Sequence, residues 1–104
     1  VERFLQILKI LEDSGVKTYV FIPPVAPSTI KQINVLQDKF KYIKELQSIL
    51  KSKNINIYDY HDPAEMHTSD CEFIDGYHGG DVLYYRILQD MSKRDISNTL
   101  SRFI

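Results

Sequence analysis

The chain of 104 residues is long enough for one domain that buries about two-thirds of the surface of its unfolded state. Its apolar content of 43% and charged content of 26% are typical of a globular protein. The formal charge of −1 argues against a nucleic-acid partner, because binding phosphates requires a concentrated basic face. Five lysines lie close together, interleaved with Asp38 and Glu45, and they form either a solvated helix face or an anion- or membrane-facing patch. These are Lys39, Lys41, Lys44, Lys51 and Lys53.

The sequence leaves the cellular compartment open. Cys71 is the single cysteine, so it forms no internal disulfide and does not fix the redox environment. No segment reaches the ~18 apolar residues of a membrane span, and no signal-peptide pattern opens the chain. Val1 already lies inside a helical pattern, without an initiator Met. We therefore expect a piece of a longer protein, and its missing targeting signal says nothing about the parent.

The first part of the chain predicts a helix and a strand. Apolar residues at helical spacing predict a first helix, which ends near Gly15. Residues 17–22 are a continuous β-branched and aromatic run, which predicts a strand buried on both faces. The prolines that follow are expected to end this strand, because proline continues neither a sheet ladder nor a helix. The helical apolar residues are Phe4, Leu5, Leu8 and Leu11, and the prolines are Pro23, Pro24 and Pro27.

The remainder predicts three helices around a second strand. Apolar residues step by three or four through one long amphipathic helix, roughly residues 30–51, and 52–54 break it. Residues 55–60 predict the second strand, followed by a polar loop at 61–72. The last two predicted helices are residues 82–91 and 95–103.

The element order α-β-α-β-α-α predicts an α/β fold with parallel strands joined by a right-handed crossover helix. Two parallel strands are an inadequate sheet, because both faces and both edges need cover. We therefore expect residues 1–104 to be one domain whose fold is incomplete. Either more strands precede it in the parent protein, or two copies join their sheets as a homodimer.

The candidate catalytic residues are Asp75 and His78, which lie three residues apart in a glycine-rich loop. An aspartate that accepts the imidazole Nδ1–H fixes the tautomer and leaves Nε2 to take a proton from a nucleophile. The spacing allows the two side chains to converge if the segment makes one helical turn. The alternative is a turn aspartate beside a surface histidine. The pair follows the last predicted strand, where ligand sites of α/β sheets lie.

The stretch from Lys17 to Met91 resembles the C-terminal half of the SGNH (GDSL-like) hydrolase superfamily. There, a strand ending in a proline-containing loop, a helix, a second strand and an Asp-x-x-His loop follow in this order. The segment from Phe73 to Asp81 is especially similar to extracytoplasmic members that modify polymers. These are the D-alanine transfer proteins of teichoic-acid modification and the alginate-type O-acetyltransferases.

The resemblance implies a partial three-layer α/β/α (flavodoxin-like) fold that lacks its N-terminal strands. It implies an esterase or O-acyltransferase acting on an acylated polymer or carbohydrate, outside the cytoplasm, with His78 as general base and Asp75 as the group that orients it. The family's Gly-Asp-Ser nucleophile loop and oxyanion motifs lie earlier in such chains and are absent here. Ser14 lies between Asp13 and Gly15, but at a helix end. We expect the isolated chain to be inactive and to need no cofactor.

The other polar residues are weaker candidates. His61 and His67, with nearby carboxylates, lack the convergent spacing of a zinc site, so no metal is predicted, although His67 could line the cleft. Cys71 is a half-buried thiol or, less readily, a nucleophile beside His78. Three tyrosines either stack on a sugar ring or pack in the fold, and the prolines at 23–27 either only end a strand or lie beside a substrate. The tyrosines are Tyr77, Tyr84 and Tyr85; the carboxylates are Asp59, Asp62, Glu65 and Asp70.

A rival interpretation belongs to a different class. The chain would be a non-catalytic α/β module that serves in assembly or partner binding. It would use the exposed sheet edge and the apolar stripe of the long helix, and self-association would cover both.

Overall fold

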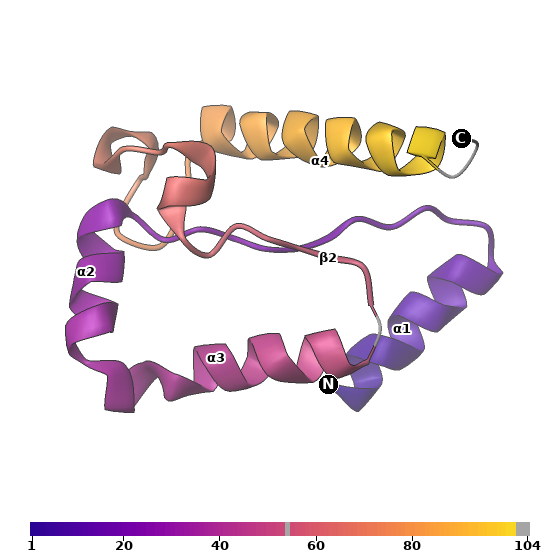
Figure 1. Ribbon diagram of the computed structural model, residues 1–104, viewed down its shortest axis with the longest axis horizontal. Coiled ribbons are helices and arrows are strands. Elements are labelled where there is room, and N and C mark those ends of the chain that lie inside the picture. The colour runs from indigo at the N-terminus through magenta and orange to yellow at the C-terminus, as the bar shows by residue number, and fades with distance from the viewer. Residues whose placement is uncertain (54, 102–104) are drawn as a thin grey trace.

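The computed structural model describes residues 1–53 and 55–101, and it is a mixed α/β structure with one parallel sheet (Figure 1). The elements are α1 (Glu2–Asp13), β1 (Val20–Ile22), α2 (Pro27–Val35), α3 (Gln37–Ser52), β2 (Ile57–Asp59), the short 3-10 helices η1 (Pro63–Met66) and η2 (Asp70–Glu72), and α4 (Asp81–Ser101).

The sheet consists of β1 and β2, which pair in parallel with Val20 opposite Ile57 and Ile22 opposite Asp59. The pairing continues one residue further, where the Tyr60 N–H donates to the Ile22 carbonyl at 3.0 Å. The predicted parallel pair is thus confirmed. Each strand is only three residues long, shorter than the sequence predicted.

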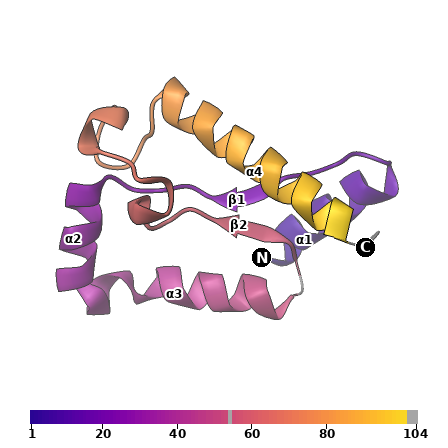
Figure 2. The ribbon, with the colours of Figure 1, turned by 45° about the horizontal axis from the view of Figure 1, so that its top comes forward.

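Helices lie on both sides of this strand pair. Figures 1 and 2 place α4 on one side and α2 with α3 on the other, so the crossover from β1 to β2 runs along one side only. The first strand was predicted to be buried on both faces, but Val20, Phe21 and Ile22 of β1 are all intermediate in exposure. Among the residues the structure describes, each strand has one neighbour, so both outer edges lack a strand partner.

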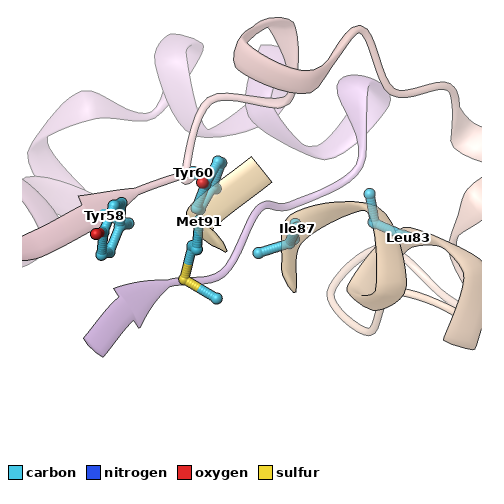
Figure 3. Close-up of a cluster of buried hydrophobic side chains, with 5 residues drawn as sticks. All are labelled: Tyr58, Tyr60, Leu83, Ile87 and Met91. Carbon is cyan, nitrogen blue, oxygen red and sulfur yellow. The ribbon is translucent and has the colours of Figure 1, made fainter. Parts of the chain in front are cut away.

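The core is the contact between α4 and β2, shown in Figure 3. Its side chains come from one face of α4 and from the end of β2, and Tyr60 is completely buried. The Tyr60 hydroxyl donates to an Asp90 carboxylate oxygen at 2.6 Å. Burial, followed by this hydrogen bond to a carboxylate, raises the pKa of Tyr60 far above its usual range. The cluster contains Tyr58, Tyr60, Leu83, Ile87 and Met91.

The predicted helix at 30–51 is wrong in its extent, because two helices occupy this stretch. Leu36 has φ −103° and ψ 39°, which ends α2 and begins α3, and Phe40 is also non-helical. Pro27 opens α2, a role that was not among those expected of the prolines at 23–27. Proline suits the first turn of a helix, where its missing N–H has no partner to lose.

The predicted division of the last helical region is also wrong. Residues 82–91 and the described part of 95–103 belong to one continuous helix, α4. No glycine or proline separates the two apolar patterns, so nothing breaks the helical ladder between them. Residues 102–103 of the predicted last helix, and Asn54 of the predicted break, lie outside the described residues.

The helices expose several large apolar side chains. On α1, Leu8 is buried, whereas Phe4, Ile7 and Ile10 are exposed. On α4, five apolar or aromatic residues outside the core cluster are exposed. No helix in the described part of the chain has the length and apolar character needed to cross a membrane. The five α4 residues are Val82, Tyr84, Tyr85, Leu88 and Ile96.

Candidate functional site

The Asp75–His78 loop lies beyond the carboxyl ends of the two strands. Because β1 and β2 are parallel, the segments that follow them meet at the carboxyl-terminal end of the sheet. There the Val25 N–H donates to the His61 carbonyl at 3.3 Å. The Ala26 N–H donates to the Gly76 carbonyl at 3.1 Å, which joins the loop to the segment after β1. The structure therefore places the loop at the sheet edge that the sequence predicted.

Asp75 and His78 are brought together by the structure. The His78 Nδ1 lies 2.7 Å from Asp75 Oδ2. Asp75 Oδ1 accepts the backbone N–H groups of Tyr77 at 2.7 Å and of His78 at 2.8 Å. With the carboxylate accepting the Nδ1–H, the ring carries its lone pair on Nε2, the arrangement a general base requires.

The pair converges through a hairpin and not through the helical turn assumed from the spacing. Residues 72–80, here called the site hairpin, are closed by an N–H···O bond of 2.8 Å from Gly80 to the Glu72 carbonyl. An antiparallel bridge joins Phe73 and Gly79, and the Ile74 N–H donates to the His78 carbonyl at 2.8 Å. Asp75 lies at the tip, where its side chain accepts the backbone N–H groups of the turn.

The electrostatics of the pair favour an ionised carboxylate. The hydrogen bond with His78, followed by those from the Tyr77 and His78 amides, lowers the pKa of Asp75 to about 2. The pair is also open: the side chains of His78 and Asp75 are 74% and 52% exposed. Since Nε2 makes no hydrogen bond within the described residues, a group from outside can reach it.

One side of the site hairpin is fixed to the start of α2. Ala26, the N-cap residue, has no side chain that can accept a hydrogen bond from the first turn. Asp70 provides this acceptor from a distant part of the chain, since its Oδ1 accepts the Ser28 N–H at 3.0 Å and the Ser28 hydroxyl at 3.1 Å. Thr29 of α2 faces Gly76 closely enough that a Cβ there would lie 2.6 Å from its Oγ1.

The other side is fixed to α4 by residues to which the sequence analysis gave no role. Arg86 contacts the Glu72 carboxylate and the Met66 carbonyl. Glu72 and Ser69 form a capping box around η2. The Ser-x-x-Glu spacing at 69–72 is the sequence signal that could have identified this turn. Nothing in the sequence indicated that Arg86 would meet it.

The two histidines of the polar loop, His61 and His67, lie in different surroundings. His67 is exposed and ends η1 in the left-handed conformation, with φ 51°. His61 is half-buried and lines a cavity of about 370 Å³ between α2, α3 and the segment after β2. In the part of the chain that the structure describes, no three His, Cys, Asp or Glu residues converge as a metal site. Cys71 is exposed, so its expected half-burial is wrong.

The aromatic and proline candidates divide between packing and exposure. The Tyr84 ring packs edge-on against Phe21, with centroids 6.4 Å apart, which confirms that at least one of the tyrosines serves packing. Tyr77 and Tyr85 are exposed. After β1, Pro24 is fully buried and Pro23 is exposed.

This arrangement can accept a proton at His78 Nε2 and stabilise the resulting imidazolium through Asp75. No hydroxyl or thiol among the described side chains is hydrogen bonded to His78, so the nucleophile of a triad is not among these contacts. Neither the known protein-family models nor the curated proteins nor the solved structures include a match to this chain.

Substitution of Gly76 by Ala tests the contact with α2. The new Cβ would clash with Thr29 Oγ1, so we expect Gly76→Ala to lower the free energy of unfolding by about 1–3 kcal/mol, the usual range for overpacking. In a Thr29→Ala background this loss should become small, because the clashing atom is gone. Urea unfolding of the single and double variants measures the coupling.

Thr29→Val is the matched control for this cycle. Valine has a methyl group where threonine has its hydroxyl, so an atom still lies close to the new Cβ. Gly76→Ala should therefore remain destabilising in that background. An equal loss from Gly76→Ala in the Ala and Val backgrounds would contradict the contact.

The low pKa of Asp75 predicts a pH dependence of the hairpin. Because the folded pKa lies below the ordinary value of 3.8, the hydrogen bonds of Asp75 stabilise the hairpin fully above that value. This contribution is lost as the pH falls through about 2. Side-chain ¹³C NMR should show Asp75 titrating near pH 2, with the Tyr77 and His78 amide resonances moving together with it. The amide shifts should be absent from Asp75→Asn, and a carboxyl that titrates at 3.8 would contradict the geometry.

Proposed function

We propose that this chain supplies the Asp–His pair of a Ser–His–Asp triad in an SGNH-like esterase or O-acyltransferase. The observation that carries the proposal is the 2.7 Å contact between His78 Nδ1 and Asp75 Oδ2, with Nε2 open to solvent. The helices on both sides of a parallel strand pair agree with a partial three-layer, flavodoxin-like fold. The serine, the oxyanion donors and the remaining strands would come from polypeptide outside these residues.

The proposed reaction is acyl transfer. The serine hydroxyl attacks the ester carbonyl carbon while His78 Nε2 takes its proton, and a tetrahedral intermediate forms. His78 then returns the proton to the leaving oxygen as the acyl–oxygen bond breaks, which leaves an acyl-enzyme. Water in an esterase, or a polymer hydroxyl in a transferase, repeats these steps in the second half of the reaction. Asp75 holds the ring and stabilises the imidazolium throughout.

The substrate class is proposed from the resemblance and from the surface around the pair. An acylated polymer or carbohydrate needs an open approach, and the exposure of His78 and Asp75 permits one. Tyr77, also exposed, offers a ring on which a sugar could stack. An extracytoplasmic location belongs to the same proposal.

His78→Ala tests the proposed role of the imidazole. In a polypeptide that carries both this segment and its nucleophile, we expect this change to lower kcat for p-nitrophenyl acetate hydrolysis by about 10³-fold or more. The chain of 104 residues alone should show no serine-dependent turnover, because the nucleophile is missing.

His67→Ala is the matched control, because His67 is an exposed histidine that is not among the hydrogen-bond or ion-pair partners of Asp75 and His78 in the described residues. It should leave kcat unchanged. Hydrolysis of p-nitrophenyl acetate by this chain that is clearly above background and unchanged in His78→Ala would contradict the proposal.

A second candidate function is assembly through this chain's uncovered surfaces. The outer edges of β1 and β2 have no strand partner among the described residues, and α1 exposes Ile7 and Ile10 at 56% and 64%. Unpaired strand edges beside apolar side chains favour association with another chain. We propose a second copy of this chain as the partner, in a homodimer that extends the sheet.

Analytical ultracentrifugation separates this candidate from a monomer. The chain should sediment as a dimer, and Ile7→Asp should shift it toward the monomer, because a buried carboxylate without a partner is costly. Glu12→Gln, which changes an exposed charge on the other side of the same helix from Ile7 and Ile10, is the control and should leave the dimer intact. Sedimentation of the unmodified chain as a monomer at all concentrations contradicts the second candidate.

A further inference from the structure

Arg86 joins two segments of the loop region that are not adjacent to each other in sequence. Its side chain is about one-third exposed. One terminal nitrogen donates to Glu72 Oε1, and the other donates to the Met66 carbonyl at the end of η1. A planar guanidinium can hold two acceptors at once in a fixed relative position, which a lysine ammonium does less well.

The Glu72 contact continues directly into the site hairpin. Glu72 Oε2 accepts the Ser69 N–H at 2.9 Å, which closes η2, and its carbonyl accepts the Gly80 N–H at 2.8 Å. The next rungs of the hairpin are the Phe73–Gly79 bridge and the Ile74–His78 hydrogen bond. Arg86 is therefore connected to the backbone of His78 through Glu72 and the successive rungs of the site hairpin.

Burial does little to hold the tip of the hairpin. Ile74 is 80% exposed, Tyr77 is 58% exposed, and the catalytic pair is open to solvent. The base of the hairpin is packed as well as hydrogen bonded, because Phe73 lies against the core and Gly79 is buried beside Leu83. Beyond this base, the orientation of the tip depends on polar contacts, together with the hydrogen bond between Ala26 and Gly76 on the α2 side. Of these contacts, only that of Arg86 connects the hairpin base by a charged side chain to the helix that forms the core.

We infer that Arg86 is a positioning residue that sets the orientation of His78 through Glu72 and the site hairpin. The inference rests on the proposed function, in which the direction of Nε2 determines whether it meets a nucleophile. Arg86 contacts neither Asp75 nor His78 among the described side chains, so it acts through the hairpin and takes no part in proton transfer.

Amide hydrogen exchange and imidazole ¹⁵N NMR of the full chain test the inference. In Arg86→Gln, exchange of the His78 and Gly80 amides should accelerate about tenfold relative to the core amides of α4, because the hairpin opens locally. The ¹⁵N shifts of His78 should move from a single Nδ1–H tautomer toward a mixture. Arg86→Lys should give a smaller acceleration, since an ammonium can pair with Glu72 without also holding the Met66 carbonyl.

Arg94→Gln is the matched control, because Arg94 pairs with Asp90 at 2.9 Å on the same helix and has similar exposure. It should leave the hairpin amides and the tautomer of His78 unchanged, whatever its effect on Tm. The inference is overturned if Arg86→Gln lowers Tm without altering the hairpin amides and the ring. If Arg86→Gln does not fold, Arg86→Lys decides: exchange and tautomer identical to those of the unmodified chain overturn it.

The outcomes also separate this inference from the proposed function. A mixture of tautomers in the unmodified chain that Asp75→Asn does not change would defeat the proposed Asp–His pair. In that case the exchange rates of the Gly80 amide would still report whether Arg86 holds the hairpin. A single tautomer that persists in Arg86→Gln, with unchanged exchange, would defeat the inference and leave the Asp–His pair intact.

Discussion

The apolar contact between α4 and the end of β2 fixes the position of everything else at the candidate site. Leu83 and Ile87 are fully buried in it, and burying aliphatic side chains of this size contributes about 1.5–3 kcal/mol each. The same helix begins directly after the site hairpin and carries Arg86 on its next turn. One packed face of α4 therefore places both the end of the hairpin and the cation that holds its base.

The parallel sheet supplies the second constraint. Because β1 and β2 run in the same direction, the segments after both strands reach the same end of the sheet and are hydrogen bonded to each other there. The site hairpin is joined to the segment before α2 by the hydrogen bond between Ala26 and Gly76, and to α4 by the ion pair of Arg86 with Glu72. Phe73 at its base also packs against the core. Directional hydrogen bonds can fix the angle of an exposed imidazole, while the apolar packing stays at the base of the hairpin. The site combines fixed geometry with open access in this way.

The two-stranded sheet explains why both candidate functions require further polypeptide. Parallel sheets are ordinarily covered on both faces and continued at their edges. Here all three residues of β1 are intermediate in exposure, and α1 exposes Ile7 and Ile10. The candidate site also has an unpaired group: His78 has a hydrogen-bond partner on Nδ1 and none on Nε2 within the described residues. Completion of the sheet and completion of the proposed triad are separate requirements.

The sequence by itself determined the features that depend on near neighbours along the chain. Apolar periodicity identified the helical regions and the two strands, their order required a parallel pair, and the spacing of Asp75 and His78 allowed them to meet. The break at Leu36 was not predictable, because the apolar pattern continues through it. Only the tertiary structure decided how the loop region around the hairpin is held: Asp70 meets Ser28 across 42 positions, and Arg86 meets Glu72 across 14. Such contacts depend on where packing places whole helices and strands, and no local sequence pattern predicts those positions.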